Sequence, residues 1–430
     1  MRWMVREDTA NKNIRYKKGI VSSTNTSIAQ LRHPTVVMWW AAAIPGYGHV
    51  MLSKYVKGFL LIFWEFVVNV NSKLNTAIMY TFTGRIEEAV EVLNIHWILL
   101  YVPVYLYSIW DSRRTTIDIN KYAILADKNW TSSEINPISF SALENNFLDK
   151  RKNWLAIFWS LITPGLGHLY VNRLPSGFYI LVWFMVVLIF SNTLPAIHYT
   201  FLGNFDKALE VVNVQWIIFL PSMYCFAPYD AYLQCDSYNK LMAKQQSYFL
   251  MKEYQDMGFK QICPILTERD DKMNVVASFD HTVYLELAIK ELENHGLPKE
   301  DIFAVPLTEK KKPKKNSEII RGSGFSLMDV TFAFGTVFSL FGVIYGFVLP
   351  GGPVTWGLIG VFFGWGLGFL IDLLVRKKAF KWKRKKGEGG EVMLMIHCKK
   401  DQITLVKEIL FDHFTLGLQV IEEDSKNGVY

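Results

Sequence analysis

Two histidines of this chain follow the same glycine-rich turn. The turn reads PGYGH at residues 45–49 and PGLGH at residues 164–168, and an aspartate lies 62 residues after each histidine, since 111 − 49 and 230 − 168 are both 62. Imidazole and carboxylate groups bind metals or pass protons, so each pair is a candidate for either chemistry. A metal site normally needs three or four ligands, often at short local spacings that are absent here. We therefore favour hydrogen bonding that holds the turn.

The residues of the two turns are candidates for either a structural or a functional role. They are Pro45, Gly46, Gly48, His49, Asp111, Pro164, Gly165, Gly167, His168 and Asp230.

The similarity between the two turns extends without a gap over about seventy positions at an offset of 119. It aligns Gly58 with Gly177, Trp64 with Trp183 and Asp111 with Asp230. Self-similarity at a fixed offset predicts a tandem duplication in the first half of the chain.

Composition divides the protein between membrane and water. Of 430 residues, 51% are hydrophobic, and the mean hydropathy of +0.15 is too high for an ordinary soluble protein and too low for a bundle of membrane helices alone. The net charge is +7, and the basic residues lie beside apolar runs, which favours anionic lipid headgroups over nucleic acid. The four cysteines form no CxxC pair, so reduced cytosolic thiols are expected. The polar start predicts no signal peptide.

Each copy contains two apolar runs suited to cross a membrane. They are 58–70 and 95–110 in copy one, and 177–197 and 214–229 in copy two. A full span needs about 20 residues. The Pro-Gly segment of copy one, residues 35–52, is broken in the middle and is expected to be a short, kinked or re-entrant helix. With two crossings per copy, every basic cluster falls on the cytosolic side.

The C-terminal part predicts a small soluble domain split by a membrane hairpin. Residues 274–279 and 302–307 are typical of strands, and the segment between them places Leu285, Ala288, Ile289 and Leu292 at helical spacing before Gly296. The β-α-β pattern returns with a strand at 392–398, a helix from about Asp401 and a strand at 418–421. Two such halves in series predict a ferredoxin-like order.

The fold class is therefore a mostly α-helical integral membrane protein with a small α+β ferredoxin-like cytosolic domain. A transmembrane hairpin, residues 330–349 and 354–371, is inserted between the two halves of that domain.

Glycines recur every fourth residue in both arms of the hairpin, a spacing that lets helix backbones approach closely in lipid. The packing of one arm on the other is the favoured interpretation, and a self-associating surface or a pore lining is the alternative. These glycines are Gly342, Gly346, Gly360, Gly364 and Gly368.

Basic segments border the hairpin on both sides and are expected to hold the soluble domain on the inner leaflet, because each basic residue near an anionic surface contributes about 1 kcal/mol. The candidate headgroup contacts are Lys310, Lys311, Lys312, Lys314, Lys315, Arg376, Lys377, Lys378, Lys381, Lys383, Arg384, Lys385 and Lys386.

Other polar residues give weaker signals. Glu65 lies within an apolar run and is a functional candidate by default. Its counterpart in copy two is Phe184, and a local pair with Lys57 or Lys73 is the competing interpretation. The histidines 281, 295, 397 and 413 all fall in the soluble halves without a convergent spacing. The chain lacks the common catalytic and nucleotide-binding motifs, so an enzyme is the minority hypothesis, with no cofactor and no metal expected.

The repeated turn resembles the TM2 family of small two-span membrane domains. The similarity lies in Gly46-Tyr47-Gly48-His49 with Asp111, and in the segment from Gly165 to Tyr170 with Gly177 and Asp230. An extra connector of some twenty residues departs from the family pattern, as do Met51 and Leu52, which stand where an aromatic residue is expected. The resemblance implies membrane topology and no particular activity.

The C-terminal region, residues 275–423, resembles bacterial general stress protein 17M-like domains. The similarity lies in its opening VVASFDHTVYLELAIKELENHG, in the glycine-rich hairpin around a Pro-Gly-Gly-Pro turn, and in its closing GGEVMLMIHCKKDQ. This resemblance implies a stress-linked bacterial protein and no catalytic residue.

These observations predict seven regions along the chain. They are a cytosolic basic tail (1–33), a TM2-like repeat (34–128), a linker (129–152), a second TM2-like repeat (153–247), a linker with the first β-α-β half (248–320), the hairpin (321–378), and a basic linker with the second half (379–430).

The leading functional hypothesis is a non-enzymatic, multi-pass protein of the bacterial cytoplasmic membrane with both termini in the cytosol. It would act as a scaffold or stress-linked sensor, with anionic lipid, an unidentified protein and a second copy of the chain as partners. The alternatives are a channel or small-solute transporter built on the repeats and, third, a lipid-modifying enzyme.

Overall fold

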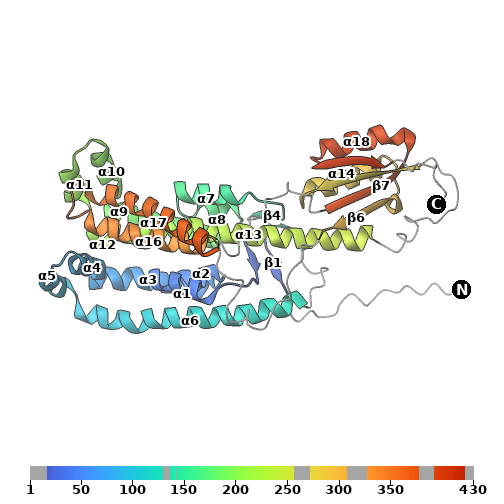
Figure 1. Cartoon of the computed structure of the whole chain (residues 1–430). Helices are drawn as coiled ribbons and strands as arrows, with labels where there is room; N and C mark the ends of the chain where they lie inside the picture. The colour runs from blue at the N-terminus through green and yellow to red at the C-terminus, as the bar shows by residue number, and fades with distance from the viewer. Residues whose placement is uncertain are drawn as a thin grey trace.

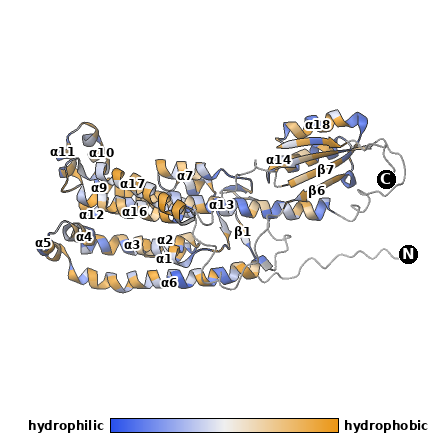
Figure 2. Ribbon diagram, viewed as in Figure 1, coloured by the Kyte–Doolittle hydropathy of each residue, from blue (hydrophilic) through white to orange (hydrophobic). Residues whose placement is uncertain are grey.

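The computed structural model describes residues 17–128, 136–142, 144–255, 272–307, 327–376 and 392–421. It is mostly helical with small sheets, and long helices run side by side toward a four-stranded sheet at one end (Figure 1). Within the described residues, three helices are long and apolar enough to cross a membrane: Leu174–Ser191, Met328–Tyr345 and Gly352–Ile371. The number becomes five if two sharply bent helix pairs each count as one span. Hydrophobic residues gather on the helices away from the sheet (Figure 2).

The two copies contain the same elements in the same order up to their last helix, which is α6 in repeat one and is divided into α12 and α13 in repeat two. Repeat one comprises β1 (Gly19–Val21), β2 (Thr26–Ile28), α1 (Pro34–Ala43), α2 (Tyr47–Met51), α3 (Tyr55–Ser72), α4 (Leu74–Phe82), α5 (Ile86–Val92) and α6 (Ile95–Lys128). Repeat two comprises β3 (Ile138–Phe140), β4 (Asn145–Phe147), α7 (Asn153–Ile162), α8 (Leu166–Tyr170), α9 (Leu174–Ser191), α10 (Thr193–Phe201), α11 (Phe205–Val211), α12 (Val214–Ile217) and α13 (Phe219–Tyr254). From β1 to α5, both bounds of every element return 119 residues later.

Three local features differ from the sequence expectations. The predicted tail and the predicted linker each hold a short antiparallel hairpin, β1 with β2 and β3 with β4. Strands of three residues carry too little pattern to be recognised in a sequence. The apolar run 177–197 is not one helix, because α9 ends at Ser191 and Asn192 takes a left-handed φ of 52° before α10 begins.

The Pro-Gly turns reverse the chain between a ten-residue helix and a five-residue helix. Gly46 and Gly165 have φ angles of 101° and 108°. A Cβ on Gly46 would lie 2.4 Å from the carbonyl oxygen of Gly58, and one on Gly165 would lie 2.6 Å from that of Gly177. Each turn therefore rests directly on the first turns of the following long helix. Because ten residues of helix span only about 15 Å, α1 and α7 are each about half as long as a bilayer core.

The four-stranded sheet and its helices form a separate lobe at the end of α13. Its elements are β5 (Lys272–Phe279), α14 (Val283–Asn294), β6 (Ile302–Pro306), β7 (Val392–Lys399), α18 (Ile403–Asp412) and β8 (Gly417–Ile421), in the strand order β6-β7-β5-β8 with every pair antiparallel. Residues of both helices and of alternate strand positions form one buried cluster, which Leu250 and Tyr254 of α13 join. The predicted strands and the helix pattern from Leu285 to Leu292 are confirmed.

Between β6 and β7 the chain leaves the lobe for a helical hairpin, α16 (Leu327–Tyr345) and α17 (Gly352–Arg376), which lies along the repeats (Figure 1). A Cβ on Gly342 would lie 2.1 Å from the carbonyl oxygen of Trp356. One on Gly360 would lie 2.2 Å from that of Phe338, and one on Gly364 would lie 2.5 Å from that of Phe334. The two backbones are thus in direct contact.

The remaining hairpin glycines occupy similar positions. A Cβ on Gly346 would lie 2.5 Å from the Cα of Pro353, and one on Gly368 would lie 2.7 Å from that of Thr331. The predicted headgroup contacts 310–315 and 377–386 lie outside the described residues, and Arg376 is the last residue of α17.

Candidate functional site

Each histidine of the repeated turns meets the aspartate that shares its repeat. His49 Nε2 lies 2.9 Å from Asp111 Oδ2, joining α2 to α6, and His168 Nε2 lies 3.1 Å from Asp230 Oδ2, joining α8 to α13. Both imidazoles are fully buried. The close-packed glycines before each histidine position the ring, because the five-residue helix can approach the long helix only where side chains are missing.

The two carboxylates are matched by cations from different sequence positions. In repeat one, Lys57 Nζ lies 2.7 Å from Asp111 Oδ2, and 46% of the lysine side chain is exposed. The position equivalent to Lys57 in repeat two holds Ser176, whose hydroxyl donates to the Arg173 carbonyl oxygen instead. Asp230 pairs with His168, and Arg173 adds positive charge nearby without a direct ion pair to the aspartate among the described residues.

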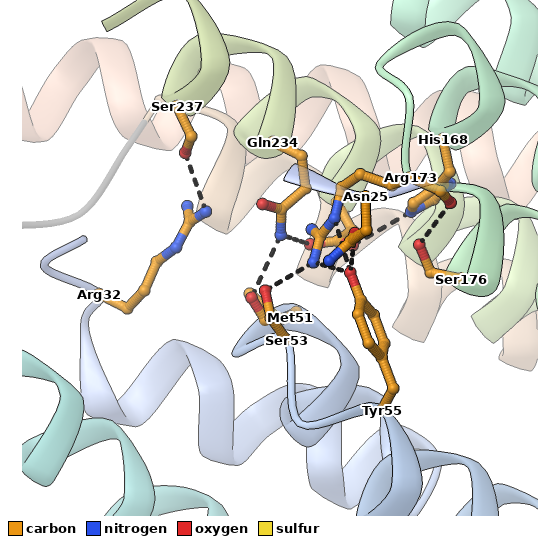
Figure 3. Close-up of polar contacts among 11 residues, drawn as sticks. Asn25, Arg32, Met51, Ser53, Tyr55, His168, Arg173, Ser176, Gln234 and Ser237 are labelled. Atoms are coloured by element: carbon orange, nitrogen blue, oxygen red, sulfur yellow. Dashed lines mark hydrogen bonds and ion pairs between the residues drawn. The ribbon is translucent and has the colours of Figure 1, made fainter. Parts of the chain in front are cut away.

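Arg173 is 1% exposed and reaches from repeat two into repeat one (Figure 3). Its Nη2 donates to Ser53 Oγ at 2.7 Å and to the Tyr55 hydroxyl at 2.5 Å, and its Nε donates to the same hydroxyl at 3.0 Å. Tyr55 in turn donates to Asn25 Oδ1 at 2.8 Å, and the backbone of Asn25 forms a β-bridge with Arg173. One guanidinium group therefore connects the loop before α3, the hairpin before α1 and the loop before α9.

Gln234 closes the site from α13. Its Nε2 donates to Asp230 Oδ1 at 2.9 Å and to the carbonyl oxygen of Met51 at 3.2 Å (Figure 3). Both oxygens of Asp230 are therefore occupied, one by His168 and one by Gln234, and the aspartate is fully buried. We call Arg173, His168, Asp230 and Gln234, with their contacts on Ser53 and Tyr55, the inter-repeat joint.

The two histidine–aspartate pairs and Arg173 leave several buried nitrogen atoms without partners. Arg173 Nη1 and the Nδ1 atoms of His49 and His168 are buried without a hydrogen-bond partner among the described residues. Each imidazole shares a hydrogen bond with a carboxylate, and neither has a hydroxyl or thiol nucleophile on Nδ1. Within the described ranges, no group of three or more His, Cys, Asp or Glu residues could hold a metal ion. The arrangement is suited to holding buried opposite charges at an interface.

A second buried polar cluster joins the repeats farther along α3. Asn69 Nδ2 donates to Glu65 Oε1 at 2.8 Å, and Gln215 Nε2 of repeat two donates to Asn69 Oδ1 at 2.7 Å. The expected pairing of Glu65 with Lys57 or Lys73 is wrong. Lys57 lies on Asp111, and the Lys73 side chain is exposed to solvent.

The lobe is joined to α13 by polar contacts as well as by apolar packing. Gln246 Nε2 donates to Glu286 Oε1 at 2.9 Å and to the carbonyl oxygen of Thr282 at 2.6 Å. Burial raises the pKa of Glu286 above the ordinary carboxyl value, and the hydrogen bond from Gln246 opposes that shift. Burial also raises the pKa of the Cys398 thiol, which disfavours a reactive thiolate there.

The lobe histidines have separate surroundings. His281 lies 3.0 Å from Gln246 Oε1, and His397 lies 2.9 Å from Asn274 Oδ1. His413 lies 3.3 Å from Glu291, and His295 follows the end of α14. These contacts show no common site.

Sequence reasoning paired the histidines with the aspartates but missed the residues that complete the joint. Gln234 is four residues after Asp230 and therefore shares its helix face, a signal that was available. Arg173 aligns with Lys54. Two aligned basic residues beside a glycine turn indicate the cytosolic side of a membrane whether their side chains are buried or exposed. Only the fold shows that Lys54 is exposed while Arg173 is buried.

No protein-family model, curated protein or solved structure matches this chain. The resemblances to TM2 domains and to general stress protein 17M-like domains therefore stay predictions.

Proposed function

We propose that this protein is a non-enzymatic scaffold or sensor of a bacterial cytoplasmic membrane, in which the lobe responds to the arrangement of the membrane repeats. The observation that carries the proposal is α13. This single helix contributes Asp230 and Gln234 to the inter-repeat joint and, at its other end, Leu250 and Tyr254 to the core of the lobe. Because a helix is stiff along its axis, a movement at the joint reaches the sheet without a flexible linker.

The hairpin supplies a second connection between the membrane part and the lobe. Tyr229 of α13 donates to Asp329 Oδ1 of α16 at 2.9 Å, and Cys225 of α13 lies against Gly335 of α16. Since α16 follows β6 and α17 precedes β7, the hairpin is inserted between two neighbouring strands of the sheet. Tilting of the hairpin against α13 would therefore strain the lobe.

The proposal includes a topology. In this topology α3, α6, α9, α13, α16 and α17 cross the bilayer, with the lobe and both termini in the cytosol and the basic segments on anionic headgroups. The helix α3 is not among the five candidate spans, and its crossing follows from the proposed two crossings per repeat. The strand order β6-β7-β5-β8 with both helices in one core supports a ferredoxin-like lobe. An unidentified protein partner of the lobe, and a second copy of the chain, belong to the same proposal.

The test measures the distance between the lobe and the repeats. Spin labels at Leu287→Cys on α14 and Leu99→Cys on α6, both exposed positions, report this distance in the full chain in vesicles of varied lipid charge and tension. The described native cysteines are buried, so the introduced residues are the preferred targets, and replacement of Cys263 removes the remaining thiol. We expect the distance distribution to shift with tension.

A proline in α13 separates this mechanism from a general softening of the protein. Ala243→Pro, between joint and lobe, is expected to abolish the shift, since proline interrupts a helix interior. The matched control is Ile124→Pro, 119 residues earlier in α6, which is not followed by the lobe. A distance that is independent of tension in the unmodified protein, or a shift that survives Ala243→Pro, would contradict the proposal.

The second candidate function is a channel or small-solute transporter. It is favoured by the polar cluster around Glu65, because ionisable groups inside membranes often mark transport pathways. Solute or ion flux through liposomes that contain the protein would support this candidate.

A further inference from the structure

The polar cluster between α3, α4 and α12 is enclosed by the two repeats. Its side chains are nearly inaccessible: Glu65 and Asn69 are 3% exposed, Asn75 is 4% exposed and Gln215 is 8% exposed. Phe66, next to Glu65 in the chain, stacks on Trp183 of the other repeat with ring centroids 4.0 Å apart. The cluster is therefore a polar island inside an apolar interface.

The amides of this cluster satisfy one another. Gln215 Nε2 donates to both oxygens of Asn69, and Asn75 Nδ2 donates to the carbonyl oxygen of Gln215 at 2.9 Å. The backbone N–H and the hydroxyl of Thr76 both donate to Gln215 Oε1, at 3.1 and 3.0 Å. Asn69 Nδ2 divides its hydrogens between Glu65 Oε1 and Asn75 Oδ1. These bonds tie repeat one to repeat two.

Glu65 is the member that the network does not satisfy. One amide serves its Oε1, and its Oε2 is buried without a hydrogen-bond partner among the described residues. The titratable groups that face it are phenols, Tyr101 and Tyr105 of α6 and Tyr47 of α2. Within the described ranges, no Lys, Arg or His forms an ion pair with it. A carboxylate in apolar surroundings needs a cation or several donors. This site supplies one amide, from Asn69, and one phenol, from Tyr101, and no cation among the described residues.

We infer that Glu65 is a proton-binding site inside the membrane part, and that the bound proton keeps the amide network between the repeats closed. With the proton, the group is a neutral acid that the Asn69 amide and the Tyr101 phenol can accompany. Without it, the buried charge draws further donors, and the amides of Asn69, Asn75 and Gln215 form the polar network next to it. Loss of the proton therefore loosens the contact of α3 and α4 with α12.

The repeats themselves supply a matched control. At an offset of 119, Glu65 corresponds to Phe184, Asn69 to Leu188 and Asn75 to Leu194, so repeat two lacks this site. The segment 192–198 therefore reports general pH effects, and the equivalent segment 73–79 reports the proton site.

The first measurement asks whether the proton is present. Infrared spectra of the full chain in lipid nanodiscs follow the carbonyl band of protonated carboxylic acids as the pH rises. We expect one such band at neutral pH that disappears at alkaline pH and that is missing in Glu65→Gln. A neutral-pH spectrum without this band, or with the band unchanged in Glu65→Gln, would overturn the inference.

The second measurement asks whether the proton controls the interface. Hydrogen exchange of the segment 73–79, expressed as a protection factor corrected for the intrinsic rate, should fall about tenfold as the band disappears. In Glu65→Gln, a neutral mimic of the protonated acid, protection should stay constant with pH. Protection that is independent of pH in the unmodified protein, or that falls equally in segment 192–198, would contradict the coupling.

A third arm distinguishes a proton from a metal cation. Sodium and potassium chloride are compared at equal concentration and fixed pH. If Glu65 binds only a proton, the infrared spectrum and the protection factor of segment 73–79 are the same in sodium chloride as in potassium chloride. A band that sodium removes would overturn the inference in favour of a sodium site.

Discussion

The two repeats build the same histidine–aspartate turn but place the nearby cation differently. In repeat one, Lys57 reaches Asp111 from the surface and nearly half of its side chain stays in solvent. In repeat two, Arg173 is buried at the interface and binds the other repeat. The comparison teaches that one backbone arrangement can serve as a local turn or as a joint between repeats. The outcome depends on which sequence position carries the basic residue and on whether that residue is exposed or buried.

The last long helix of each repeat also ends in different surroundings. The helix α6 ends at Lys128, whereas α13 continues into the core of the lobe. The inter-repeat joint and the lobe are therefore on one helix, while the aspartate that pairs with Lys57 lies on α6. If repeat two transmits movement to the lobe, substitutions at its joint should change stability more than substitutions at the equivalent positions of repeat one.

The largest expected effect comes from removing the two cations. Arg173→Leu removes the charged hydrogen bonds to Ser53 and Tyr55, each of which contributes about 1.5–3 kcal/mol, and should lower the free energy of unfolding by about 3–5 kcal/mol. Lys57→Leu removes a partly exposed ion pair and should cost about 0–1 kcal/mol. Reversible unfolding in mixed micelles measures both values.

A double variant sharpens this comparison. Asp230→Asn combined with Arg173→Leu removes both charges and should recover part of the lost stability, because no isolated charge remains in the interior. Equal losses in Arg173→Leu and Lys57→Leu would show that burial does not distinguish the two repeats.

The second largest loss of stability should come from the turn glycines, and it should be equal in the two repeats. Gly46→Ala and Gly165→Ala each force an L-residue into a left-handed conformation, at about 1–2 kcal/mol, and place a Cβ against a carbonyl oxygen, which adds about 1–3 kcal/mol of overpacking. Thermal unfolding of both variants is the measurement.

The matched controls for the turn glycines are Gly84→Ala and Gly203→Ala. Their φ angles of 81° and 73° are also positive, but a Cβ there would meet open space. These control variants should lose only the stability that the left-handed conformation costs an alanine, about 1–2 kcal/mol, because no overpacking is added. A loss at Gly46 or Gly165 no larger than at the controls would contradict the close contact between turn and helix.

The smallest effect concerns pH at the junction of α13 and the lobe. The pKa of Glu286 is raised in the folded protein, so its contribution to stability is fully present below the ordinary carboxyl pKa and is lost as the pH rises through the raised value. Glu286→Gln should remove this dependence and leave protection of α14 flat across that window. Hydrogen exchange of residues 283–294 tests it, and an unchanged pH profile in the variant would assign the effect to another group.

The elements of the lobe could be predicted because their signals are local. Leu285, Ala288, Ile289 and Leu292 repeat at helical spacing, and Gly296 follows with a positive φ of 86°. A one-sided helix must bury its apolar face wherever it lies, so the pattern survives in the sequence. The three-residue strands β1 to β4 have no such period, and Gln215, which bonds Asn69 beside Glu65, lies in the other repeat.

The sequence alone determined the duplication of the turn, the pairing of each histidine with its aspartate and the alternation of apolar runs with a region of strands and helices. Tertiary structure alone decided that Arg173 is buried while Lys54 is exposed, and that Gln215 reaches Asn69 across the repeats. The physical reason is that periodicity and turn chemistry act between neighbours in the chain. The burial of a charge depends instead on which distant segment packs over it.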